Sequence, residues 1–211
     1  MFVKAPFEGI SLENKKNLFT LFSVHVYTFN ENEDLLSIIK DDDVICIIDT
    51  GNAIITRTNY DGSRSIIEEL NKDSIFGTRI SSLNSNEFQI IAKESTTIIV
   101  INYDTLINSN NLKYEYYNKF LQNIFCIVNE LSQSKNERIR ILTKKSIRNK
   151  LLEYFKIEQN KQHTKKIIIP YTFTELADYL SIDRSAMTRE LKYMKEENFI
   201  QVKGKIITIL F

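Results

Sequence analysis

The stretch from Thr172 to Phe211, TFTELADYLSIDRSAMTRELKYMKEENFIQVKGKIITILF, decides the fold of the C-terminal part of the chain. Thr172 and Glu175 have the spacing of a capping box, in which each side chain satisfies a free backbone N–H of the first helical turn. Apolar residues at helical spacing then mark one face of a short helix: Leu176, Ala177 and Leu180. The stretch is therefore expected to begin with a capped helix.

A second helix is expected after a short turn at 181–183. Asp183 is a favourable N-cap, because its carboxylate accepts hydrogen bonds from free N–H groups at the start of a helix. Apolar residues occur at helical spacing: Ala186, Met187, Leu191 and Met194. Polar residues fall on the opposite side: Arg184, Ser185, Thr188, Arg189 and Lys192. Arginine and hydroxyl side chains on the first turns of such a helix favour reading of a DNA major groove.

The last residues predict a β-hairpin wing with its turn at Gly204. Lys203 and Lys205 flank this glycine and are expected to contact the DNA backbone, which positions a protein without specifying sequence. An ordinary helical hairpin with a solvated polar face is the alternative interpretation of the two helices. The wing and the basic charge of this part favour DNA binding.

The charge is distributed unevenly along the 211 residues, although the whole chain has a net charge of +1. Residues 144–211 contain 14 lysines and arginines against 8 aspartates and glutamates, a net charge of +6. The preceding residues contain 14 against 19, a net charge of −5. A small basic domain attached to a larger acidic one is a charge pattern typical of DNA-binding proteins. The basic domain neutralises phosphates, and the acidic domain does not.

The segment ADYLSIDRSAMTRELKYMKEENFIQVKGK resembles the C-terminal domain of the Crp/Fnr family of bacterial transcription regulators. The Arg-Ser…Thr-Arg arrangement of the second helix and the Asn-Phe-Ile…Gly run into the wing carry the resemblance. The base-reading positions of the family fall on Arg184, Ser185, Thr188 and Arg189. Ser185 stands where many members have a glutamate, so a different preferred half-site is expected. Ser181 stands in the turn where glycine is common.

The resemblance implies an α+β fold with an N-terminal antiparallel β-roll of the cyclic-nucleotide-binding type, a long dimerisation helix and a C-terminal winged helix-turn-helix. We expect a β-roll sensor domain over 1–109, a dimerisation helix and hinge over 110–142, and a DNA-binding domain over 143–211. Short β-branched runs with turn residues between them support a barrel or roll: VICIID (44–49), AIITRT (53–58), SIIEEL (65–70), FQIIAK (88–93) and TTIIVI (96–101). A β-sandwich is set aside only through the resemblance.

The effector segment that the resemblance implies opens with Ile-Phe-Gly, as at Phe76 and Gly77. Members that bind cyclic nucleotides follow with a glutamate for the ribose, where this chain has Thr78, and with an arginine for the phosphate. The phosphate position falls near Asn86 and Glu87, and 81–88 contain no arginine or lysine. A buried phosphate would lack its cationic partner and would be repelled by Glu87. Cyclic AMP is therefore not the expected effector.

Two further positions of the effector pocket fall on the long helix, at Leu131 and Ser132, where family members contact the nucleotide base. Leu131 cannot form a hydrogen bond. Other family cofactors are not expected either: an iron–sulfur cluster needs about four thiolates, and the chain has two cysteines, which we interpret as free thiols. His25 and His163 do not suggest a haem or metal site. A metal-dependent enzyme of the cupin type would need clustered histidines and carboxylates. No cofactor, metal site or catalytic residue is expected.

The stretch 110–142 predicts the dimerisation helix. Apolar residues with 4-3-4-3 spacing form a coiled-coil seam: Tyr117, Leu121, Ile124, Val128 and Leu131. A helix buried within a monomer is the alternative. The polar run from Lys135 to Lys144 is interpreted as the hinge, and a further helix is expected over 145–159, with Ile147, Leu151 and Phe155 inward.

These patterns predict a homodimeric, sequence-specific DNA-binding transcription regulator that acts on an inverted-repeat operator. The β-roll is expected to sense an unidentified signal. A constitutive or protein-gated regulator, whose roll binds no small molecule but contacts RNA polymerase or another protein, is the alternative. No apolar run approaches the length of about 20 residues that spans a bilayer, so a cytoplasmic, non-enzymatic protein is expected.

Overall fold

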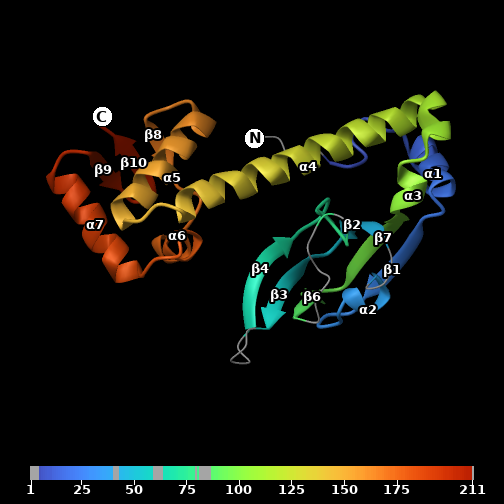
Figure 1. The fold of residues 1–211 in the computed structure, drawn as a ribbon, viewed down its shortest axis with the longest axis horizontal. Helices are drawn as coiled ribbons and strands as arrows, with labels where there is room; N and C mark the ends of the chain where they lie inside the picture. The colour runs from blue at the N-terminus through green and yellow to red at the C-terminus, as the bar shows by residue number, and fades with distance from the viewer. Residues whose placement is uncertain (1–4, 40–42, 59–63, 79, 81–86, 211) are drawn as a thin grey trace. The chain divides into compact units, whose positions relative to one another are not determined.

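The computed structural model describes residues 5–39, 43–58, 64–78, 80 and 87–210 of the chain (Figure 1). The chain divides into two compact units, Phe2–Asn129 and Glu130–Phe211, with the boundary inside the long helix α4 (Glu115–Leu142). We describe the two units separately. No helix of the described residues is both long and apolar enough to cross a membrane.

The N-terminal unit contains two antiparallel sheets that form a β-roll (Figure 1). The four-stranded sheet has the order β1 (His25–Phe29), β7 (Thr96–Asn102), β2 (Val44–Thr50) and β5 (Ile75–Phe76). The three-stranded sheet has the order β4 (Arg64–Leu70), β3 (Ala53–Thr58) and β6 (Phe88–Ala92). Each of the five predicted β-branched runs lies on one of these strands, which confirms the expected architecture. Asp61-Gly62, a dipeptide typical of a hairpin turn, lies outside the described residues.

The core of the roll lies between the two sheets, because the strands alternate their side chains between opposite faces. One cluster contains Cys46 and Ile98 from the first sheet and Ile55 and Ile90 from the second, all at most 3% exposed. Burial raises the pKa of the Cys46 thiol far above its usual range, as expected for an inert core thiol. Neither cysteine forms a disulfide.

Helices of the N-terminal unit were not expected from the β-rich sequence. They are α1 (Leu12–Leu21), α2 (Leu36–Ile39), α3 (Tyr103–Leu106) and the 3-10 helix η1 (Ser109–Lys113). Helix α1 starts at the N-cap Ser11, whose hydroxyl accepts from the Asn14 backbone N–H at 3.2 Å. Just after α1, the Phe22 ring lies 5.4 Å from the ring of Phe120 on α4. The N-terminal segment thus covers one face of the long helix.

The 28-residue helix α4 confirms the predicted long helix. Its face toward the N-terminal segment buries Tyr117, Phe120 and Ile127, and the Tyr117 hydroxyl donates to the Leu106 carbonyl at 2.7 Å. The polar run that was interpreted as the hinge is helical up to Leu142. The connection to the next helix consists of residues 143–146.

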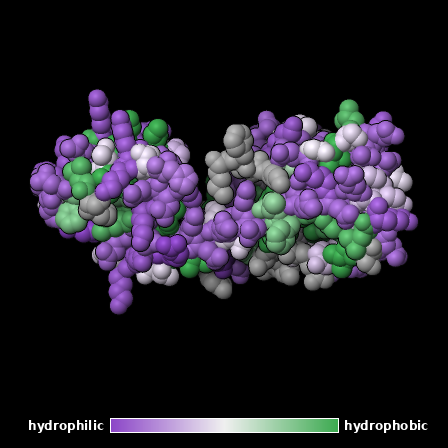
Figure 2. Space-filling model, turned by 90° about the horizontal axis from the view of Figure 1, so that it is seen from above, coloured by the Kyte–Doolittle hydropathy of each residue, from purple (hydrophilic) through white to green (hydrophobic). Residues whose placement is uncertain are grey.

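The C-terminal unit confirms the predicted helix-turn-helix and wing. Its remaining elements are α5 (Ile147–Gln162), β8 (Lys166–Ile168), α6 (Phe173–Tyr179), α7 (Arg184–Glu196), β9 (Ile200–Lys203) and β10 (Ile206–Ile209). The strands form an antiparallel sheet in the order β8-β10-β9. A core of apolar residues from all of these helices and strands holds the unit together. On the face drawn in Figure 2, hydrophilic side chains cover most of this unit.

Candidate nucleic-acid interface

The start of α6 has the predicted capping box. The Glu175 backbone N–H donates to Thr172 Oγ1 at 3.2 Å, and the Thr172 backbone N–H donates to Glu175 Oε2 at 2.6 Å. The hydrogen bonds from Thr172 lower the pKa of the Glu175 carboxyl. These reciprocal bonds satisfy two N–H groups that the helix leaves free, so they fix where α6 begins.

The turn between α6 and α7 is held by a lysine that sequence reasoning missed. Ser181 has a φ of 50°, in the left-handed region that favours glycine. Lys150 Nζ on α5 donates to the carbonyl of Leu180 at 3.0 Å and to that of Ser181 at 3.4 Å. A cation at the last carbonyls of a helix satisfies free acceptors and complements the helix dipole. Lys150 therefore stabilises a turn in which Ser181 has unfavourable backbone geometry.

Asp183 is the N-cap of α7, as predicted. Its carboxylate accepts from the Ala186 backbone N–H at 2.8 Å and from the Ser185 hydroxyl. These bonds, with that from Ser185 the largest, lower the pKa of the Asp183 carboxyl. The Thr188 hydroxyl donates to the Arg184 carbonyl at 2.9 Å. The hydroxyl protons of Ser185 and Thr188 are thus used within the helix, which leaves both oxygens as acceptors.

Helix α7 presents two distinct sides. Met187, Leu191 and Met194 are buried, with 0%, 7% and 0% of their surface exposed. The predicted reading residues are all exposed on the other side: Arg184, Ser185, Thr188, Arg189 and Lys192. Among the described residues, no carboxylate lies within ion-pair distance of either arginine, and Lys192 Nζ lies 3.8 Å from Glu196. The guanidinium groups of α7 are therefore available to an anionic partner.

The wing turns at Gly204, which has a φ of +60°, a conformation that glycine adopts without strain. Lys203 and Lys205 are exposed on either side of it. A hollow of about 730 Å³ beside the wing is lined by residues that include Lys203 and two further lysines, Lys166 and Lys195. Their only signal in the sequence was the basic composition of this part.

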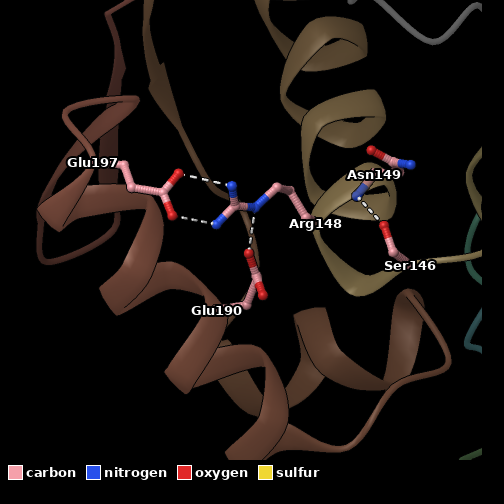
Figure 3. Close-up of polar contacts among 5 residues, drawn as sticks. All are labelled: Ser146, Arg148, Asn149, Glu190 and Glu197. Carbon is pink, nitrogen blue, oxygen red and sulfur yellow. Dashed lines mark hydrogen bonds and ion pairs between the residues drawn. The ribbon is translucent and has the colours of Figure 1, made fainter.

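An arginine on α5, which sequence reasoning missed, binds the carboxylate of Glu190 on α7 and that of Glu197, the C-cap of α7. Figure 3 shows the Arg148 side chain between Glu190 and Glu197. Its Nε donates to Glu190 Oε1 at 2.6 Å, and its Nη1 and Nη2 donate to the two Glu197 oxygens at 2.7 and 2.8 Å. We call Arg148, Glu190 and Glu197 the Arg148 cluster. The bonds that Arg148 donates to Glu197, and then those to Glu190, raise the pKa of Arg148 further above its already high value.

The predicted effector residues around Gly77 that the structure describes pack within the N-terminal unit. Phe76 is fully buried. Gly77 has a φ of +130°, and a Cβ there would lie 2.4 Å from the Val44 carbonyl oxygen. The Val44 backbone N–H donates to Thr78 Oγ1 at 3.2 Å. Gly77 and Thr78 therefore lie tightly against the start of β2.

Glu87 forms an ion pair with Arg57 of β3, with 2.9 Å between Nη2 and Oε2. Sequence reasoning missed Arg57, which lies 30 residues earlier in the chain. Asn86 lies outside the described residues. Leu131 and Ser132 lie on the part of α4 that belongs to the C-terminal unit, where Leu131 is half-buried and Ser132 is exposed.

The predicted seam residues of α4 fall into two groups. Tyr117 and Ile124 are 1% and 7% exposed, because they pack within their own chain. Leu121 is half-buried and Val128 is 38% exposed. Phe125, which the predicted seam did not include, is 73% exposed. The structure therefore leaves Leu121, Phe125 and Val128 together on the open side of the helix, at spacings of four and three residues.

Comparison with known proteins supports the same interpretation. The family model of the Crp-like helix-turn-helix domain matches residues 147–210. A solved structure of a CprK variant complexed with OCPA has a TM-score of 0.62 at 14% identity and covers 100% of this chain and 96% of its own. A CooA mutant from Carboxydothermus hydrogenoformans has a TM-score of 0.54 at 17% identity, covering 91% and 86%. No curated protein matches the chain at the level of sequence.

The domain match identifies α6 and α7 as a helix-turn-helix of the Crp type, and the structural likeness extends the same fold to the β-roll and the long helix. Helix-turn-helix domains place their second helix in the major groove of DNA. The chain therefore combines a Crp-like helix-turn-helix domain with a fold similar to those of the solved CprK and CooA structures.

Proposed function

We propose that the chain is a sequence-specific regulator that binds an inverted-repeat operator as a homodimer. The observation that carries this proposal is the exposed side of α7, on which Arg184 and Arg189 lack ion-pair partners among the described residues, while the opposite side is buried. In a symmetric dimer the two copies of α7 would lie about 34 Å apart, in successive major grooves of one DNA face. Residues 1–109 would form the sensor, 110–142 the dimerisation helix and hinge, and 143–211 the DNA-binding domain.

The residues of the interface have different roles in this proposal. Arg184 and Arg189 would contact guanine edges or phosphates, because a guanidinium matches the O6 and N7 acceptors of guanine. Ser185 and Thr188 would act as acceptors, since their protons are already donated within the helix. Lysines would contact phosphates, which positions the protein on the duplex: Lys192, Lys203 and Lys205.

The dimer would form along the open side of α4. Leu121, Phe125 and Val128 present apolar surface there, and the Phe125 side chain is 73% exposed. Burying an apolar side chain of this size contributes about 1.5–3 kcal/mol, and a twofold axis would bury each residue twice. Leu131 would extend this surface. Tyr117 and Ile124 would support it from within each subunit.

The signal would act on the β-roll, and it is not expected to be cyclic AMP. Among the described residues, Glu87 offsets the charge of Arg57 at the position expected for a phosphate. An anionic ligand that paired with Arg57 in place of Glu87 would leave the Glu87 carboxylate without its partner. Thr78, in place of a ribose-binding glutamate, accepts from the Val44 backbone N–H.

Selection of bound duplexes from a random DNA pool tests this proposal. We expect enrichment of an inverted repeat with half-sites about 10 base pairs apart, centre to centre. Sedimentation of the complex is expected to give two chains per duplex. A protein that sediments as a monomer and enriches no sequence, even at low salt, would contradict the proposal.

A constitutive or protein-gated regulator is the second candidate for the role of the roll. It is favoured by the internal engagement of Thr78 and Glu87, and its roll would contact RNA polymerase or another protein. A thermal-shift screen with nucleotides and small metabolites separates the two candidates. Saturable stabilisation by one compound favours ligand gating, because a ligand that binds only the folded state raises its stability.

A further inference from the structure

We propose that Arg148 is a positioning residue for DNA recognition. By binding both Glu190 and Glu197, Arg148 sets the position of α7 along its axis and its rotation about that axis. The inference rests on the proposed function of α7. It adds a residue that would not touch DNA and that lies outside the helix-turn-helix itself.

Two of the three buried side chains of α7 are methionines, Met187 and Met194. Methionine is unbranched and adapts its shape to irregular spaces, so these contacts restrict a small shift of α7 along or around its axis less than branched side chains would. Directional contacts are needed to define one position.

The Arg148 cluster supplies such contacts. Glu190 and Glu197 lie seven residues apart on one side of α7, which corresponds to two helical turns and about 10 Å along the axis. A single guanidinium donates to both, with three hydrogen bonds between 2.6 and 2.8 Å (Figure 3). The planar guanidinium has its donors in a fixed arrangement. A rotation or translation of α7 would therefore break at least one of the three bonds.

The cluster lies directly beside the residues that would read DNA. Glu190 follows Arg189 in the sequence, so the rotation that places the Glu190 carboxylate also sets the direction in which Arg189 leaves the helix. Arg148 also lies against the ring of Phe199, just after α7, with 5.9 Å from Cζ to the ring centre. The C-terminal end of α7 is thus held at two points.

A second contact of α5 completes the arrangement. Arg148 and Lys150 lie on the two sides of the buried stripe of α5 that includes Leu151 and Tyr154. Lys150 donates to the carbonyls of the helix-turn-helix turn, whereas Arg148 binds α7. Helix α5 therefore holds the α6–α7 turn through Lys150 and holds α7 through Arg148, from opposite sides of its own buried stripe.

The Arg148 cluster also balances charge next to the DNA-facing surface. Without Arg148, two carboxylates would be left unpaired on α7, where they would repel phosphates. The hydrogen bond from Arg148 lowers the pKa of the Glu197 carboxyl, so the pair stays ionised at neutral pH.

The test compares Arg148→Ala and Arg148→Lys with Arg140→Ala in the full chain. Arg140 is a matched control. It also pairs with a carboxylate, that of Glu153, but this ion pair joins α4 to α5 and includes no residue of α7. Affinities are measured for the selected duplex and for a scrambled duplex of equal length. Hydrogen exchange of the α7 backbone is measured in the free protein, and thermal unfolding checks that each variant is folded.

Both Arg148 variants are expected to reduce the ratio of the two affinities by about tenfold or more, because a reading group tolerates displacements of only about 0.5 Å. Arg148→Lys is informative because it keeps the charge and loses the planar arrangement. The backbone of 190–199 is expected to exchange faster in both, but not in Arg140→Ala. Unchanged exchange of α7, or an unchanged affinity ratio in a folded Arg148→Lys protein, would overturn the inference. Wild-type protein that binds no duplex would instead contradict the proposed function, and the exchange measurement would still decide whether Arg148 positions α7.

Discussion

Helix α7 and the segment around Gly77 both lie where a ligand is expected, yet they use their polar side chains differently. On α7, Arg184 and Arg189 are exposed and lack ion-pair partners among the described residues. In the N-terminal unit, Glu87 pairs with Arg57 and Thr78 accepts from a strand backbone. One region leaves its charges available to a partner, and the other satisfies them internally.

This difference separates a binding surface from a segment whose groups already have partners. An unpaired cation on a solvated surface costs little and gains strongly from a phosphate or a guanine edge. A paired group must first lose its partner, so a ligand gains only the difference. The exposed arginines of α7, which lack ion-pair partners among the described residues, therefore support DNA binding. Ligand binding by the roll would require its paired side chains to rearrange.

The largest expected effect is that of Phe125→Lys on α4, the helix that contains the boundary between the two units. A charged side chain on the open apolar side of α4 should weaken the proposed dimer by about 100-fold or more, because each subunit would place it in the interface. Operator affinity should fall with it, since a monomer contacts one half-site. Sedimentation and anisotropy measure both. Leu112→Lys is the control, because Leu112 is also exposed (54%) but lies outside α4; equal effects of both variants would contradict the proposed interface.

Arg189→Ala tests the available charge directly. The loss of one bidentate base contact costs about 1–3 kcal/mol, and a dimer loses two, so affinity for the selected duplex should fall roughly 30-fold or more while the dimer stays intact. Arg57→Ala removes the paired arginine of the roll and should leave DNA affinity within about twofold. If Arg189→Ala keeps its full sequence preference, the assigned reading side of α7 is wrong.

Acid should destabilise the C-terminal unit through its paired carboxylates. The pKa values of Glu153, Glu175, Asp183 and Glu197 are lowered in the folded state, through hydrogen bonds from basic side chains or from their own helix caps. A lowered carboxyl pKa contributes stability that is present above the unfolded value and is lost as the pH falls through the folded value. The protection of amides within 147–210, taken relative to their intrinsic exchange rate at each pH, should therefore fall as the pH drops below about 4.5. Protection that stays constant down to pH 2 would contradict this expectation.

Lys203→Ala should mainly change the salt dependence of binding. Each phosphate contact contributes about 0.9 to the slope of log K against log salt concentration, so a dimer that loses two should have a slope smaller by roughly 2. Anisotropy titrations at several salt concentrations measure the slope. Lys156→Ala, on an exposed position of α5, should leave it unchanged. The same loss in both variants would indicate a general charge effect.

The smallest expected effect is that of Ser181→Gly. Glycine removes the strain of a φ of 50°, so the variant should be more stable by up to about 1 kcal/mol, less the entropy that glycine adds to the unfolded chain. Chemical denaturation measures this change, and DNA affinity should remain constant. A destabilised variant would mean that the serine side chain contributes more than its backbone costs.

Local patterns were sufficient for much of the fold. The capping box of Thr172 and Glu175, the N-cap Asp183 and the turn at Gly204 depend on residues a few positions apart, and each was predicted correctly. The β-branched runs also identified five strands. Helix α1 was missed, because its polar sequence LENKKNLFTL lacks a strong apolar periodicity and is stabilised by packing against α4.

Helical periodicity and caps act within single turns, so the amino-acid sequence was enough to predict a helix-turn-helix with a basic, polar exposed side. Only the tertiary structure decided which apolar residues of α4 are buried in the chain, as Tyr117 is, and which stay open, as Phe125 does. It also brought Arg57 to Glu87 and Arg148 to Glu190 and Glu197, across separations of 30, 42 and 49 residues. Such pairs form when packing brings distant segments together, and no spacing within one segment records them.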